Sequence, residues 1–159
     1  CLAVYNHGGK AYLASGSWDR TIKIWSLDNH ALVRTIDGDD VGHIKSISIV
    51  NIDDRQMLAS GDNDGKIKLL SVGDYECIGS INAHSSYINS LAVIDSYGKV
   101  CLVSASYDKT IKIWDLESQA VMKILEINSC ITVMAAFMNG DEACLATGDT
   151  ENNIKLWME

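Results

Sequence analysis

The sequence predicts an all-β protein, because one pattern of short apolar strands and polar turns recurs four times along its 159 residues. Four segments align without gaps: SGSWDRTIKIW (15–25), SGDNDGKIKLL (60–70), SASYDKTIKIW (104–114) and TGDTENNIKLW (147–157). Their first residues are 45, 44 and 43 positions apart. A steady period of this length indicates one supersecondary unit that is repeated and stacked.

Each unit contains strand-like segments joined by polar turns. The IKIW tracts at 22–25 and 111–114 alternate isoleucine with lysine or tryptophan, which is the period of two of a β-strand. A short apolar strand precedes each such tract across a polar turn, so the pair predicts a hairpin. Further apolar runs lie before every hairpin and after the first three. The chain therefore predicts 15 strands in four units, which we place at 1–37, 38–82, 83–126 and 127–159.

Four short antiparallel strands per unit describe one blade of a β-propeller. The tract SASYDKTIKIWDL (104–116) closely resembles the strand-turn-strand motif of WD40 repeats, and the resemblance covers essentially the whole chain. It implies a WD40-type β-propeller of about four blades, the last without its outer strand. Rings of this family usually have about seven blades, so the resemblance implies part of a larger ring. It also implies a non-catalytic platform for protein–protein contacts.

The WD40 resemblance further implies a buried chain of four hydrogen-bonded side chains, which in the third unit are His84, Ser104, Asp108 and Trp114. A buried indole N–H needs an acceptor, and a hydroxyl can accept that bond while it donates another to an imidazole. We expect Asp108 to fix the tautomer of His84. The other units retain parts of the chain: Ser15, Asp19 and Trp25, then Ser60 and Asp64, then Thr147 and Trp157.

Two units depart from the full set. In the second, Leu70 replaces the tryptophan, and an aspartate falls at the place of His84 with His43 beside the strand. In the fourth, Glu151 replaces the aspartate and Ile127 stands where the histidine would fall. Only the third unit therefore carries the complete network.

Serine, histidine and aspartate are also the parts of a hydrolase. A hydrolase requires an exposed nucleophile, an oxyanion hole and a cleft. Ser104 is expected in the middle of a strand, and its equivalents Ser15, Ser60 and Thr147 would imply an active site in every unit. We therefore expect a structural network and no catalytic residue.

The residues just before the acidic turn positions are Trp18, Asn63, Tyr107 and Thr150. A tryptophan or tyrosine cannot pack into the core from such a turn. By resemblance these turns share one face that rings the central channel, and Tyr87, in the loop that enters the third unit, would lie on the same face. Exposed aromatic residues are frequent hot spots of interfaces, so these five residues are the candidate partner-binding residues.

Composition restricts the partners. The formal charge of −8 and the pI near 4.8 disfavour nucleic acid and anionic membranes and favour proteins or peptides, including basic ones. No apolar run approaches the ~18 residues of a membrane span. None of the five cysteines has C-x-x-C spacing, and the histidines lack the spacing of metal ligands, so we expect no metal and no cofactor. Reduced thiols, with Cys101 and Cys144 buried, favour an intracellular site in the cytoplasm or nucleus.

The four units leave open ends. The outward faces of the first and last units and the edge strand at 153–158 have no neighbour in this sequence. We therefore expect a piece of a longer protein, in which the remainder of the propeller closes the ring. A strained ring of four blades and two chains that complete a ring of about eight blades are the alternatives. A second functional hypothesis is a sensor or substrate-recruiting module of a larger enzyme of the ubiquitin-ligase, kinase or nucleotide-binding ATPase type.

Overall fold

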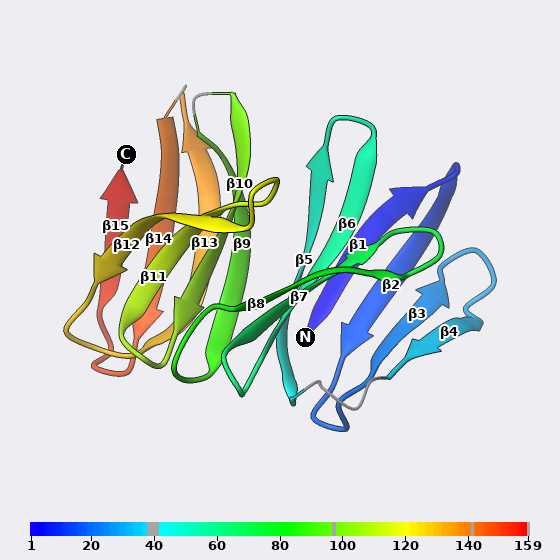
Figure 1. Cartoon of the computed structure of the whole chain (residues 1–159), viewed down its shortest axis with the longest axis horizontal. Coiled ribbons are helices and arrows are strands. Elements are labelled where there is room, and N and C mark those ends of the chain that lie inside the picture. The colour runs from blue at the N-terminus through cyan, green and yellow to red at the C-terminus, as the bar shows by residue number, and fades with distance from the viewer. Residues whose placement is uncertain (38–41, 97, 141, 159) are drawn as a thin grey trace.

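The chain folds into four antiparallel sheets that stand side by side (Figure 1). The computed structural model describes residues 1–37, 42–96, 98–140 and 142–158. These residues contain 15 strands and no helix. Each sheet uses only strands that are consecutive in the sequence, so each is one blade. The predicted all-β class, with four repeated blades, is confirmed.

The first two blades each have four strands in sequential order. Blade one contains β1 (Leu2–His7), β2 (Lys10–Gly16), β3 (Ile22–Ser26) and β4 (Leu32–Ile36). Blade two contains β5 (Ile44–Ile52), β6 (Arg55–Asp62), β7 (Lys66–Ser71) and β8 (Cys77–Asn82).

The last two blades differ by one strand. Blade three contains β9 (Ile88–Ser96), β10 (Lys99–Ser106), β11 (Thr110–Asp115) and β12 (Ala120–Glu126). Blade four contains β13 (Ile131–Asn139), β14 (Glu142–Asp149) and β15 (Ile154–Met158). β15 is therefore the open edge of blade four, as the sequence predicts for its third strand.

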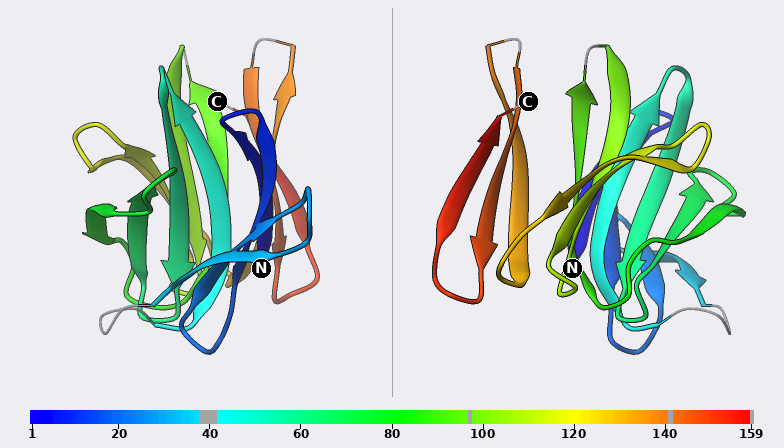
Figure 2. Two further views of the ribbon diagram at one scale, coloured as in Figure 1. Left: turned by 90° about the vertical axis from the view of Figure 1, so that its right-hand side faces the viewer. Right: turned by 60° about the vertical axis from the view of Figure 1, so that its left-hand side comes forward.

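Consecutive blades pack face to face through their apolar side chains. The first strands of neighbouring blades contact one another, β1 with β5, β5 with β9 and β9 with β13. Figure 2 shows the resulting fan from two further sides. One apolar core fills each of the three spaces between blades. The alternation of the third strands builds these cores, because Ile22, Ile67 and Ile111 all turn toward the following blade and are buried.

The two outermost faces of the fan are apolar and exposed. Ile154 of blade four is 81% exposed, although its equivalents Ile67 and Ile111 are fully buried. On the opposite end, Leu2 pairs with Ser15 as Leu91 pairs with Ser104, yet Leu2 is 67% exposed while Leu91 is buried. The four blades therefore form an open arc, and they do not close into a strained ring by themselves.

The turn between the second and third strand of each blade has one repeated backbone geometry. Its fourth residue has a positive φ, at Arg20 (69°), Gly65 (80°), Lys109 (67°) and Asn152 (63°). At Gly65 glycine is also required by space, because a Cβ there would lie 2.1 Å from the carbonyl oxygen of His84. The turn of blade two thus packs directly against the loop that enters blade three.

Candidate functional site

The four side chains of blade three form one continuous hydrogen-bonded chain. Trp114 on β11 donates its indole N–H to Ser104 Oγ on β10 at 2.8 Å. Ser104 Oγ lies 2.7 Å from His84 Nε2, and His84 Nδ1 lies 2.9 Å from Asp108 Oδ2 in the following turn. Ala83 and His84 donate their backbone N–H groups to Gly65 O at 2.9 Å, which holds the imidazole at the end of β10.

The partners of Asp108 determine the direction of these bonds. Its carboxylate accepts from the Thr110 hydroxyl and backbone N–H and from the Ser85 backbone N–H. These bonds and the nearby imidazole lower the pKa of Asp108 although its burial alone would raise it. Burial lowers the pKa of His84, and the attraction of Asp108 offsets this only in part. The neutral His84 therefore donates from Nδ1 to Asp108 and accepts at Nε2 from Ser104.

This geometry does not fit a hydrolase. The Ser104 side chain is fully buried, and its oxygen is already engaged by Trp114 on one side and by His84 on the other. A nucleophile needs space for the substrate carbonyl within contact distance. Ser104 lacks that space. The four hydrogen-bonded side chains instead link the strand, the loop and the turn of blade three.

Of the four-member chain, blades one and four keep the bond between indole and hydroxyl, and blade two lacks it. Trp25 Nε1 donates to Ser15 Oγ in blade one, and Trp157 Nε1 donates to Thr147 Oγ1 in blade four, both at 2.9 Å. In blade two Leu70 fills the place of the tryptophan and is buried. The aspartate expected at the place of His84 in that blade is residue 40, which lies outside the described residues.

The turn carboxylate of blade two is not the one that the sequence alignment suggests. Asp62, two residues before Asp64, accepts the backbone N–H groups of Asp64 and Lys66, both at 2.9 Å. Its other oxygen accepts from the backbone N–H of Gly42 in the incoming loop, at 3.1 Å. Asp62 therefore joins turn and loop directly, without a histidine between them, and the assignment of this role to Asp64 is wrong.

Blade four uses the same arrangement. Asp149 accepts the backbone N–H groups of Glu151 and Asn153 and, at 2.5 Å, the hydroxyl of Ser129 in the incoming loop. The bond from Ser129 is the largest cause that lowers the pKa of Asp149, to about 2. Ile127, at the place of the histidine, is buried and donates its backbone N–H to Lys109 O.

A sequence signal distinguishes these two designs. Blades one and three have a serine two residues before the turn aspartate, in SWD and SYD. The hydroxyls of Ser17 and Ser106 accept from the aspartate backbone N–H. Blades two and four have an aspartate at that place, in DND and DTE. The carboxylate that caps the turn thus moves by two positions, and the motif differs accordingly.

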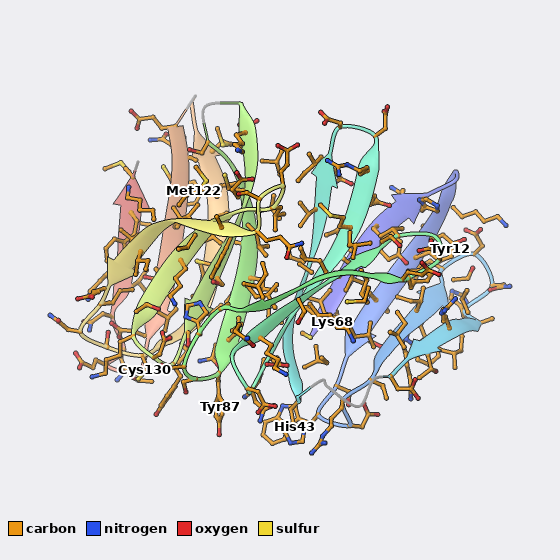
Figure 3. The ribbon with its side chains drawn as sticks, in the orientation of Figure 1. Tyr12, His43, Lys68, Tyr87, Met122 and Cys130 are labelled. Carbon is orange, nitrogen blue, oxygen red and sulfur yellow. The ribbon has the colours of Figure 1, made fainter. Side chains whose placement is uncertain are left out.

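Five side chains from three blades gather at one end of the molecule and form what we term the turn surface: Trp18, His43, Lys45, Tyr87 and Tyr107. Lys45 Nζ lies 4.8 Å from the ring centre of Trp18 and 5.5 Å from that of Tyr87. The Tyr87 and Tyr107 rings are 6.2 Å apart, and the Trp18 and His43 rings are 5.6 Å apart. Figure 3 shows His43 and Tyr87 pointing outward at this end.

The three aromatic side chains of the turn surface are exposed, by 67% for Trp18, 46% for Tyr87 and 49% for Tyr107. The sequence did not predict that Lys45 and His43 belong to the turn surface, because their proximity to the aromatic rings depends on how neighbouring blades pack. His43 Nδ1 also contacts the backbone oxygen of Trp18, which ties the loop of blade two to the turn of blade one.

The two remaining candidates have different surroundings. Asn63 is half-buried, and its side-chain oxygen accepts the backbone N–H of His43 at 2.5 Å. Asn63 therefore supports the loop beneath the turn surface. Thr150 is exposed on the turn of blade four, where its backbone N–H donates to Cys130 O.

The described residues contain no group of three or more histidine, cysteine or acidic side chains placed to bind a metal ion. No helix among them is long and apolar enough to cross a membrane. None of the five cysteines, which all lie in the described ranges, forms a disulfide, and Cys101 and Cys144 are buried as expected.

The repeated blades with their indole–hydroxyl bonds define a β-propeller of the WD40 class. The family model for the WD domain, G-beta repeat, matches residues 1–26, 31–71 and 75–115. These ranges cover most of the chain, so the chain belongs to the WD40 repeat family.

Among curated proteins, the chain is 29% identical to "Small ribosomal subunit protein RACK1y" from rice, over 91% of this chain and 43% of that protein. It is 30% identical to "Nuclear distribution protein nudF" from Aspergillus niger, over 91% of this chain and 32% of that protein. It is also 30% identical to "Mitochondrial division protein 1" from Eremothecium gossypii, over 91% and 23%. The chain thus spans less than half the length of each of these relatives.

A solved structure shares the fold. The WD40 β-propeller domain of Doa1 superposes with a TM-score of 0.75 at 21% identity, over 97% of this chain and 50% of that one. The four blades therefore correspond to about half the length of a chain that contains a WD40 propeller.

Proposed function

We propose that this chain is a protein-interaction platform whose turn surface contacts a protein or peptide partner. The observation that carries the proposal is the exposed aromatic group of Trp18, Tyr87 and Tyr107, which comes from blades one and three and is joined by Lys45 of blade two. Large aromatic side chains that remain in water on a rigid framework are the residues that most often dominate binding energy.

The relatives support a binding role. Their names refer to a ribosomal subunit, to nuclear distribution and to mitochondrial division. Proteins with such different roles share these repeats, which is expected when the repeats provide a framework and the exposed residues choose the partner. Cysteines that form no disulfide fit a reducing compartment such as the cytoplasm or nucleus.

The chemistry of the partner follows from charge and from Lys45. The net charge of −8 favours a basic partner at long range. At the surface itself, Lys45 already occupies the space between the rings of Trp18 and Tyr87. A basic side chain of the partner would compete with it for the same ring faces. We therefore propose that such a partner displaces Lys45, so that Lys45→Ala should strengthen the complex.

We also propose that further WD40-type blades cover the two open faces, either from the remainder of a larger propeller or from a second chain. The support is that every blade face equivalent to these two is buried against another blade, as for Ile67 and Leu91 compared with Ile154 and Leu2. An apolar sheet face of this kind gains free energy when it is covered.

Affinity purification tests the platform. Trp18→Ala combined with Tyr107→Ala should reduce recovery of the bound proteins about 30-fold or more, because truncation of one hot-spot residue typically costs at least ~2 kcal/mol. The matched control is Val33→Ala with Met122→Ala, which are similarly exposed on the outer strands β4 and β12. Full retention of all partners by the aromatic double variant, or equal losses in the control, refutes the proposal.

A further inference from the structure

Lys45 contacts aromatic rings from the blades on both sides of its own. It lies at the start of β5 in blade two, and its Nζ is 4.8 Å from the ring centre of Trp18 in blade one. The same atom is 5.5 Å from the ring centre of Tyr87, in the loop that enters blade three. A cation within about 6 Å of a ring centre is attracted by the negative face of that ring. The chain thus holds one of its own ammonium groups between two exposed rings.

This contact departs from the repeat. The equivalent residues of blades three and four are Asn89 and Thr132, because each follows the first isoleucine of its inner strand. Asn89 donates to Ile131 O of the next blade at 2.8 Å, and Thr132 donates to Gly148 O of its own blade at 3.0 Å. These short side chains end on the backbone of the framework, whereas the long side chain of Lys45 reaches the rings of the turn surface.

The backbone on both sides of Lys45 is anchored. The backbone N–H of His43 donates to Asn63 Oδ1 at 2.5 Å, and Ser46 Oγ accepts the backbone N–H of Leu91 at 2.8 Å. An ammonium that is tethered in this way reaches the rings without the entropy cost of association. A cation from another molecule must therefore gain more from the rings than the lysine ammonium does if it is to displace it.

We infer that Trp18 and Tyr87 form a binding site for a trimethylated ammonium group on a partner peptide, and that Lys45 fills this site when no partner is bound. An unmodified ammonium has three N–H donors that water satisfies and ring faces satisfy poorly. A trimethylammonium keeps the charge but has no N–H, so it loses less when it leaves water for the rings. The exposed ring of Tyr107, 6.2 Å from that of Tyr87, extends the same surface.

This inference rests on the proposed partner site at the turn surface and names the group that the site takes. NMR titration of the ¹⁵N-labelled chain tests it with Ac-Gly-Lys-Gly-NH₂, with the same peptide carrying trimethyllysine, and with a neutral analogue in which a tert-butyl group replaces the trimethylammonium. We expect the trimethylated peptide to shift the Trp18 indole N–H resonance at concentrations up to roughly 10 mM. It should bind about two- to fivefold more tightly than either of the other two peptides.

Two variants test the part of Lys45. Lys45→Ala should strengthen binding of the trimethylated peptide about two- to fivefold, because it removes the internal competitor. The matched control is Lys10→Ala, which removes an exposed lysine at the opposite end of β2 and changes the net charge equally, so binding should not change.

The inference is overturned if the trimethylated peptide causes no shift at Trp18, if the three peptides bind equally, or if Lys45→Ala leaves binding unchanged or weakens it. Tetramethylammonium that binds as tightly as the trimethylated peptide would overturn the assignment to a peptide. The platform itself is tested by recovery of partners with the Trp18→Ala and Tyr107→Ala double variant. Loss of those partners together with equal binding of the three peptides would therefore reject this inference and retain the platform.

Discussion

The hydroxyl of Ser104 carries the internal order of blade three, because it joins an indole on one side to an imidazole on the other. Both partners are buried. Removal of the hydroxyl would leave the Trp114 indole N–H and the His84 Nε2 atom without this partner, and removal of the imidazole would leave the Ser104 hydroxyl without its acceptor. The cost of such a loss comes mainly from the unpaired group that remains, rather than from the bond itself. The residues that resemble a catalytic set thus stabilise the fold.

His84→Ala should lower the free energy of unfolding by roughly 1–3 kcal/mol, because the variant leaves Ser104 and Asp108 with unpaired groups in a buried position. His43→Ala should cost much less, because His43 is only half-buried at the surface of the loop. Urea titrations of the two variants against the wild type measure both values. Equal losses would contradict the assignment of the network to His84.

The stability of the chain should fall when the pH drops below the ordinary His pKa of about 6.5. The folded state lowers the pKa of His84. Between the folded and unfolded pKa values the unfolded chain therefore binds more protons, and acidification stabilises the unfolded state relative to the folded one. The contribution is complete above the unfolded pKa and is lost as the pH falls through the folded one. The urea midpoint should therefore fall less between pH 7.5 and lower pH in His84→Gln, whose side chain cannot titrate, than in the wild type. The same change of midpoint with pH in both proteins would exclude this explanation.

At the level of the element, each turn between second and third strand needs an acceptor for its backbone N–H groups and a bond to the incoming loop. Blade three meets both needs with Asp108, which accepts from the Ser85 backbone N–H of the incoming loop and also contacts His84. Blade two meets them with Asp62, which accepts from the Gly42 backbone N–H without a histidine. There Asn63 adds a second bond to the incoming loop, from the backbone N–H of His43.

Asp62→Ala should lower stability by about 2–3 kcal/mol, because the backbone N–H groups of Gly42, Asp64 and Lys66 lose their common acceptor. Asp64→Ala should change stability by less than about 0.5 kcal/mol, because its side chain is exposed on the turn. Thermal or urea unfolding of the two variants distinguishes them. A larger loss in Asp64→Ala would restore the alignment-based assignment.

The strands were predictable because their alternating pattern is local. The same holds for the Trp114 to His84 chain, whose spacing recurs in a known motif. The sequence shows an aspartate at position 62 (DND) where blade three has a serine (SYD). That this aspartate takes over the turn could not be predicted, because the role depends on which backbone N–H of the incoming loop its carboxylate reaches. The position of Lys45 between two rings depends on packing between blades, which no repeat pattern contains.

For the whole molecule, the arc has two apolar ends that match the faces buried inside it. The face of Ile154 and Leu156 on blade four corresponds to the face that blade three presents to blade four. The face of Leu2 and Val4 on blade one corresponds to the one that blade two presents to blade one. The two ends of the arc therefore correspond to the two sides of an interface between neighbouring blades, so one end of one molecule can pack on the other end of a second molecule.

The isolated 159-residue chain should self-associate through these ends. Leu2→Lys or Leu156→Lys alone should weaken association, because each introduces a charge into the head-to-tail contact. A mixture of the two variants should recover one contact, since each retains one unchanged face. Sedimentation velocity compares the wild type, the two variants and their mixture. The control Ile113→Lys, at the buried equivalent of Leu156, should unfold the chain instead; a monomeric wild type would contradict the expectation.

We propose that partners meet this protein at the turn surface. Site-specific photocrosslinking in the cells that express it tests this most directly, with p-benzoylphenylalanine in place of Tyr107 and, as the control, in place of the similarly exposed Val33 on β4. We expect protein adducts at position 107 that Trp18→Ala diminishes, and few at position 33. Adducts at position 33 with none at position 107 would contradict a partner site at the turn surface.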